Sequence, residues 1–133
     1  MSEGVLREVT LALPLVPEIE LEASKTAAAI AESIHMNPDR IDEVRLAVVE
    51  ACLNALLYSE ADEVFLTFQV LGQGDPEKLR IVVHDDGIGF DPEAPAPRPG
   101  GGWGLKIMRG LMDEMEIHSG PEVGTTVVMS KLR

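Results

Sequence analysis

The pattern of apolar and polar positions divides the first half of the chain into a strand and two helices. Alternation with β-branched residues predicts a strand over 7–13. Apolar residues recur at helical spacing over 18–36 and again from Pro38 to about Ser59. Asn37 is a good N-cap for the second helix, and Pro38 suits its first position. This second helix is the most apolar segment of the chain, so we expect most of it to be buried.

The second half of the chain continues with strands, a loop and a shorter helix. Strands over 63–71 and 78–85 flank a segment rich in Gly, Asp and Pro, which predicts a hairpin. The Pro- and Gly-rich run from Asp91 to Gly102 can form neither helix nor strand, and we expect a surface loop there. The remaining elements are a helix over 103–115 and strands over 116–119 and 124–132.

These elements together predict an α+β fold built as a two-layer α/β sandwich. Hairpin-linked strands favour a mixed, mostly antiparallel sheet, with the helices packed on one of its faces. The chain has 133 residues, of which 45% are hydrophobic. That length is sufficient for one core and too short for two ordinary ones, so we expect a single domain spanning 1–133.

Composition limits the classes of function. The formal net charge of −12 argues against direct binding of nucleic acid, because that task depends on Lys and Arg neutralising phosphates. The lone Cys52 permits no internal disulfide, and the N-terminal residues lack the basic start and apolar run of a secretory signal. No apolar run is long enough to span a bilayer. We therefore expect a cytoplasmic protein that does not bind a membrane.

Two carboxylates and two glycines follow each other in the stretch VHDDGIGF, at the end of the predicted strand over 78–85. A carboxylate that is partly buried there, Asp85, is costly unless a donor satisfies it. Gly87 and Gly89 would let a flat ligand approach the backbone, so an amino-bearing heterocycle such as adenine meets both conditions. The alternative is that DDGIG is only a turn, with Asp and Gly present for their backbone preferences.

A second candidate feature is a pair of polar residues on the apolar helix. Glu50 and Asn54 are four residues apart, which places them on one helix face one turn from each other. A carboxylate next to an amide oxygen can act as a general base beside a Mg²⁺ ligand. The alternative is that Glu50 faces solvent and Asn54 caps neighbouring backbone.

A third feature is the glycine-rich backbone that runs into the predicted helix over 103–115. Its N–H groups and the positive end of the helix dipole suit an anion such as a triphosphate. The P-loop pattern is absent, and Ile107 stands where the dinucleotide-binding fingerprint requires a third Gly. The three His residues have no paired spacing, which argues against a zinc site.

Taken in order, these motifs resemble those of the GHKL ATPase superfamily, which includes histidine kinases and gyrase. The resemblance covers nearly the whole chain and implies the Bergerat ATP-binding fold. Within the superfamily, the small size and the phrases EACLNAL and GLMDE resemble the RsbW-type anti-sigma factor serine/threonine-protein kinases of bacterial partner-switching systems. The motifs are Glu50-x-x-x-Asn54, Asp85-x-Gly87-x-Gly89-Phe90, Gly102-x-Gly104-Leu105 and Gly124-Thr125-Thr126.

The resemblance implies a role for each matched residue near the adenine ring and the metal ion. Asp85 matches the aspartate that accepts a hydrogen bond from the adenine amino group. Gly87 and Gly89 match the adenine side of the pocket. Asn54 matches the Mg²⁺ ligand, and Glu50 matches the general base.

The resemblance also implies residues on the phosphate side of the nucleotide. Gly102, Gly104 and Leu105 match the motif at the end of the ATP lid. Thr126 lies in the strand whose threonine commonly supports the adenine-binding aspartate. One departure is visible, because Tyr58 stands where many relatives carry a His four residues after the Asn.

The function implied by the resemblance is that of an ATP- and Mg²⁺-dependent serine protein kinase and anti-sigma factor. Such proteins phosphorylate a STAS-domain antagonist, alternatively bind a sigma factor, and usually form homodimers. Retention of Glu50 favours this hypothesis. The alternative is a non-catalytic ATP-binding switch module of the same fold that binds a regulatory partner, which Tyr58 slightly favours.

Overall fold

The computed structural model describes residues 4–89 and 103–133, and for Trp103 and Gly104 only the backbone. The predicted loop from Asp91 to Gly102 lies outside the described residues. The element order over the described chain agrees with the prediction. The elements are β1 (Gly4–Pro14), α1 (Ile19–Ser33), α2 (Pro38–Tyr58), β2 (Glu63–Gln73), β3 (Asp75–Asp85), α3 (Trp103–Leu111), β4 (Glu114–Gly120) and β5 (Gly124–Leu132).

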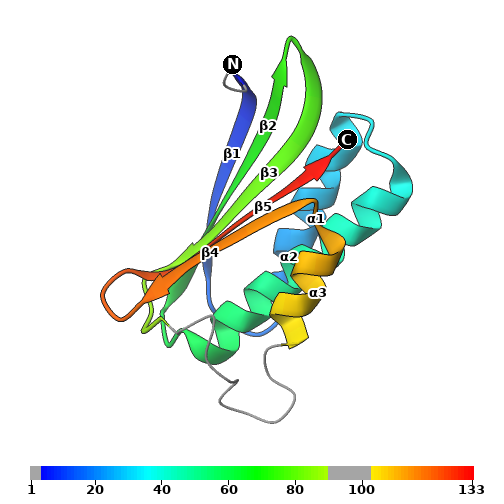
Figure 1. Cartoon of the computed structure of the whole chain (residues 1–133). Coiled ribbons are helices and arrows are strands. Elements are labelled where there is room, and N and C mark those ends of the chain that lie inside the picture. The colour runs from blue at the N-terminus through cyan, green and yellow to red at the C-terminus, as the bar shows by residue number, and fades with distance from the viewer. Residues whose placement is uncertain (1–3, 90–102) are drawn as a thin grey trace.

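The strands form one five-stranded sheet in the order β1-β2-β3-β5-β4. Each pair of neighbouring strands is antiparallel, so the described sheet is antiparallel rather than mixed. The three helices pack on one face of the sheet, and the other face is left open (Figure 1). The two-layer α+β architecture predicted from the sequence is therefore confirmed.

The core fills the space between the sheet and the helices, with α2 packed between α1 and α3. The helix α2 is less buried than predicted: seven of its 21 residues are buried, all on the side that faces the core, and Cys52 is one of them. Burial, with a smaller contribution from the charge of Glu20, raises the pKa of the Cys52 thiol to about 12. No helix in the described part of the chain is both long and apolar enough to cross a membrane.

Two helix ends differ from the prediction. The helix α3 stops at Leu111 rather than Met115, because Glu114 and Met115 already pair with β5 as the start of β4. The apolar residues after Leu111 fit both a helical period and a strand alternation, so the sequence pattern alone could not distinguish a longer helix from an earlier strand. The helix α1 stops at Ser33, and two residues later His35 adopts a left-handed φ of 58° that turns the chain toward α2.

Candidate functional site

A pocket lies where the last turns of α2, the end of β3 and the first turn of α3 meet. Asp85, the last residue of β3, lines it and is only 4% exposed. The rest of the lining is apolar or weakly polar. It consists of Ala51, Asn54, Ala55, Tyr58, Ser59, Val83, Gly89, Leu105, Thr125 and Val127.

Asp85 presents a buried acceptor in this pocket. The backbone N–H of Gly87 donates a hydrogen bond to its Oδ1 at 2.9 Å. Burial raises the pKa of the Asp85 carboxyl above its ordinary value, and the charge of Asp86 adds to the rise. The hydrogen bond from Gly87 and the charge of His84 partly offset it. A ligand that donates a hydrogen bond here would compensate for a carboxylate that the fold holds out of water.

The two glycines that follow Asp85 are required by contacts within the protein. A Cβ at Gly87 would lie 2.1 Å from the carbonyl oxygen of Ser59, the C-cap residue of α2. That oxygen accepts a hydrogen bond from the N–H of Ile88 at 2.8 Å. Gly89 has a φ of +72°, and its Cβ would lie 2.2 Å from the carbonyl oxygen of Gly120. The sequence interpretation attributed both glycines to the approach of a ligand, but close packing of the chain explains them, although Gly89 also lines the pocket.

Replacing Gly87 by Ala is expected to lower the free energy of unfolding by about 1–3 kcal/mol, because the new methyl group overlaps the backbone of Ser59. A matched control is Gly110→Ala in α3, where no described atom beyond the helix's own backbone and the chain neighbours lies within 4 Å of the added Cβ. That change should raise stability by roughly 0.5–1 kcal/mol. Urea unfolding of the three proteins measures both effects. Equal stability of wild type and Gly87→Ala would contradict the contact with Ser59.

The helix α2 contributes the two polar residues that the sequence singled out. Asn54 is half-buried and lines the pocket, as does Tyr58 one turn later. Glu50 is half-buried one turn before Asn54 and lies outside the pocket lining. The structure thus brings Asn54 and Asp85 to one pocket and leaves Glu50 next to it along the helix.

Thr126 does not face the pocket. It pairs with His84 in the sheet, and its Oγ1 lies 2.7 Å from Nδ1 of that histidine. The neighbouring Thr125 pairs with Asp85, is buried and lines the pocket. Successive residues of a strand point to opposite faces, so only one of two adjacent threonines can reach the site. Thr126 lies in β5 as predicted, but it faces away from the pocket, and it is Thr125 that lines the pocket, with its Oγ1 at 2.7 Å from Oγ of Ser119.

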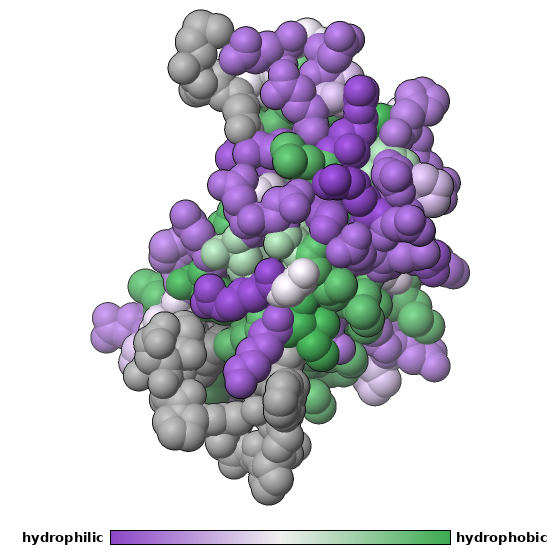
Figure 2. Space-filling view, turned by 45° about the vertical axis from the view of Figure 1, so that its right-hand side comes forward, coloured by the Kyte–Doolittle hydropathy of each residue, from purple (hydrophilic) through white to green (hydrophobic). Residues whose placement is uncertain are grey.

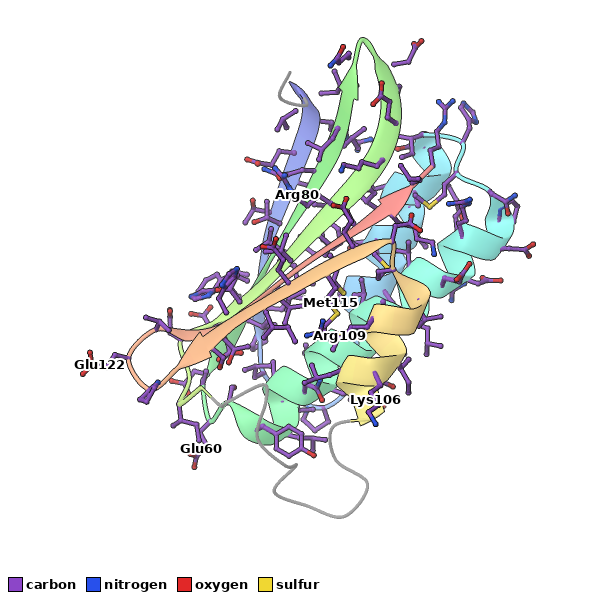
Figure 3. The ribbon with its side chains drawn as sticks, in the orientation of Figure 1. Glu60, Arg80, Lys106, Arg109, Met115 and Glu122 are labelled. Carbon is purple, nitrogen blue, oxygen red and sulfur yellow. The ribbon has the colours of Figure 1, made fainter. Side chains whose placement is uncertain are left out.

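The start of α3 supplies the phosphate-side residues that the structure describes. Gly104 lies in the first turn of α3, and Leu105 lines the pocket. Gly102 lies outside the described residues. Figure 3 shows Lys106 at this end of α3, with Arg109 one turn further along the helix. The sequence analysis did not single out Lys106, although a cation directly after the glycine motif is the residue type that phosphate binding uses.

The side chains near the pocket suit a Mg²⁺ ion that is held by few protein oxygens, and they do not suit a metal ion whose ligands all come from the protein. Within residues 4–89 and 103–133 there is no group of three or more His, Cys, Asp or Glu side chains that could hold a metal. Mg²⁺ keeps several waters and is bound in nucleotide sites through one or two protein oxygens plus phosphates. The amide oxygen of Asn54 can supply such a ligand.

The helical side of the molecule also exposes apolar side chains. Leu46 and Leu57 on α2 are 46% and 53% exposed, and Ile107 on α3 is 37% exposed. Figure 2 brings this side forward and shows apolar residues gathered on it among hydrophilic ones. Apolar surface of this kind commonly contacts other proteins.

Comparison with known proteins gives one family, two relatives and one solved structure that are similar to this chain. Residues 14–131 match the family described as the histidine kinase-like ATPase domain. The chain is 33% identical to the serine-protein kinase RsbW of Bacillus licheniformis, over 89% of this chain and 81% of that protein. It is 26% identical to the anti-sigma F factor of Oceanobacillus iheyensis, over 93% and 91% of the two chains. Among solved structures, the RsbU and RsbW domains of a Mycobacterium tuberculosis protein superpose with a TM-score of 0.72 at 19% identity, over 95% of this chain and 32% of that one.

Proposed function

This chain belongs to the histidine kinase-like ATPase family, and within it to the RsbW-type anti-sigma factor kinases. From this membership we propose that the chain is an ATP-dependent serine protein kinase. Its substrate would be a STAS-domain antagonist. In the alternative state it would sequester a sigma factor, as a homodimer in the cytoplasm.

The observation that supports ATP binding is the placement of Asp85 and Asn54 in one pocket. Asp85 would accept a hydrogen bond from the adenine amino group, next to the backbone of Gly89. Asn54 would hold Mg²⁺, which neutralises negative charge on the phosphate oxygens during transfer. Lys106 lies at the start of α3, where a cation could contact the phosphates.

Glu50 is the proposed general base. In phosphoryl transfer to a serine, the serine oxygen bonds to the γ-phosphorus while the bond from phosphorus to the bridging oxygen breaks and ADP leaves, and a carboxylate can accept the hydroxyl proton. Glu50 lies one turn from Asn54 on α2, so a carboxylate and the proposed metal ligand share one rigid helix. Its position beside the pocket rather than in its lining suits an acceptor that arrives on another protein.

The proposal of sigma-factor binding is supported by the exposed apolar side chains on α2 and α3. Leu46, Leu57 and Ile107 offer contact area that does not include the pocket lining. Sequestration and phosphorylation could therefore use different surfaces of one chain.

The test of the kinase activity is incubation with ATP, Mg²⁺ and a STAS-domain protein encoded near this chain in its genome. The intact mass of that protein should increase by one phosphoryl group, and chelation of Mg²⁺ should prevent the increase. ATP binding without any transfer would instead favour the second candidate, a non-catalytic ATP-binding switch that binds a regulatory partner. Tyr58, which lines the pocket in place of the family's frequent His, is the observation that favours this second candidate.

The neighbouring threonines offer a matched pair of variants for testing the pocket. Thr125→Val is expected to weaken ATP binding by about twofold to tenfold, because it removes a hydroxyl from the pocket beside Asp85. Thr126→Val should leave the affinity unchanged, because that side chain lies with His84 on the open face of the sheet. Titration calorimetry compares the two. A larger loss of ATP affinity for Thr126→Val than for Thr125→Val would contradict the orientation of β5, in which Thr125 faces the pocket.

A further inference from the structure

The strand β1 forms one edge of the sheet, and the helices cover it incompletely. Its residues Arg7, Val9 and Leu11 pair with residues of β2 whose side chains lie in the core, so they face the helical side as well. On β2 this inward row is fully buried, whereas Val9 and Leu11 are only half-buried and Arg7 is exposed. Figure 1 shows β1 at the rim of the sheet, beyond the helical layer.

A shallow, open groove lies between β1 and α1. Its floor is apolar, with Val9 from β1 and Ile30 from α1. Two cations line it, Arg7 from the strand and Lys25 from the helix. A hydrogen bond of 3.1 Å from Nη1 of Arg7 to Oγ of Ser33 holds the guanidinium against α1.

The charge of this groove is opposite to that of the protein as a whole. The chain carries 11 Lys and Arg residues against 23 Asp and Glu residues. Two cations from different elements nevertheless line one groove, and the described residues of its lining include no carboxylate. Such a site attracts a negatively charged group, and the apolar floor selects one that also carries apolar side chains.

The edge of β1 adds backbone recognition to this chemistry. β1 has 11 residues, and within residues 4–89 and 103–133 it pairs on one side only, with β2. An unpaired strand edge presents N–H and C=O groups to which an extended segment can add as a further strand. The opposite edge strand, β4, is shorter, with seven residues, and carries the exposed carboxylates Glu114 and Glu116.

We propose that an extended acidic segment of a partner protein adds to the edge of β1 and fills this groove. Because side chains alternate along a strand, every second residue of the segment would face the groove. Carboxylates there would pair with Arg7 and Lys25, and apolar side chains would pack on Val9 and Ile30. The site is separate from the proposed nucleotide pocket, since the described residues that line the two have no member in common.

A second copy of this chain fits the groove less well. If β1 of another copy added antiparallel to this edge, its own inward row would lie over the groove. That row carries Arg7, Val9 and Leu11, so it would bring a second cation and no carboxylate. Charge complementarity therefore favours a different, acidic partner.

The test is a selection from a phage-displayed library of random peptides about as long as β1. Peptides are selected on the wild-type chain and depleted on the double variant Arg7→Glu/Lys25→Glu. We expect enriched peptides to alternate apolar residues with Asp or Glu. The best peptide should bind the double variant at least about tenfold more weakly, which corresponds to about 1.4 kcal/mol.

A matched control is Arg45→Glu, which reverses an exposed cation on α2 and should leave peptide binding unchanged. Both groove cations are exposed, so the double variant should fold, and unchanged ATP affinity would verify this. Hydrogen exchange should show peptide-dependent protection of amides in β1. Selected peptides without acidic residues, equal binding to the double variant, or protection elsewhere would overturn the proposal. So would sedimentation showing self-association that the double variant abolishes, since a second copy would then occupy the groove.

Discussion

Replacing Glu50 by Gln is expected to slow phosphorylation of the antagonist by about a hundredfold to ten-thousandfold, the usual effect of losing a general base. The variant keeps the shape of the side chain and the turn of α2 that carries Asn54, and it leaves Asp85 unchanged. ATP affinity should therefore stay close to that of wild type, and only the proton-transfer step should be impaired. The measurement is the rate of partner phosphorylation by intact mass, with nucleotide affinity determined in parallel.

The matched control for Glu50 is Glu60→Gln. Glu60 is exposed just beyond the end of α2, where Figure 3 shows it extending away from the fold. Its replacement should change neither rate nor affinity. Sigma-factor binding should persist in Glu50→Gln, because the proposed contact surface does not depend on the base. Undiminished phosphorylation would remove Glu50 from the mechanism, and a parallel loss of ATP affinity would show that its role is structural.

Replacing Asp85 by Asn is expected to weaken ATP binding by about tenfold to somewhat over a hundredfold. A hydrogen bond to a charged acceptor contributes roughly 1.5–3 kcal/mol, and the neutral amide forfeits that contribution. The control is Asp86→Asn, one residue along the chain. Asp86 is exposed, and its Oδ1 lies 2.7 Å from Nε2 of His84 on the open face of the sheet. Calorimetric titration with ATP that gave equal affinities for wild type and Asp85→Asn would exclude Asp85 as the adenine contact.

The raised pKa of Asp85 predicts a pH signature for the same pair of proteins. Because burial raises the pKa, the carboxylate is protonated at a higher pH than an ordinary Asp. ATP affinity of wild type should fall as the pH decreases through that raised value, and Asp85→Asn should lack this step. The linkage for stability has the opposite sign. Without nucleotide, Asp85 favours folding most when protonated, so the stability of wild type relative to Asp85→Asn should decrease as the pH rises through the folded pKa.

The sequence predicted the architecture because the hydrophobic periods of its long elements are unambiguous. The helix α2 shows this best, with Asn37 as an N-cap whose side chain accepts a hydrogen bond from the N–H of Asp39 at 2.9 Å. Short elements with mixed periods were less secure, and the residues after Leu111 entered β4 instead of extending α3. Pairing with β5 sets that boundary, and the local sequence pattern carries no information about this pairing.

The lining of the candidate pocket was predicted in part for a similar reason. Residue type and spacing singled out Asp85 and Asn54, which the fold brings to one pocket. The choice between Thr125 and Thr126 depends on the register of β5 against β3, which neither residue reveals by itself. Gly87 packs against Ser59, which is far from it in the chain. The structural reason for a glycine at this position could therefore not be predicted from the sequence.

The buried thiol of Cys52 makes the chain convenient to label. Burial raises the pKa of this thiol to about 12, so it stays protonated near neutral pH, and maleimides react with the thiolate. A cysteine introduced at an exposed position such as Arg45 should therefore take a fluorophore while Cys52 stays unmodified. A chain with one added cysteine, and without removal of its own, can thus carry a single probe for following partner exchange in real time.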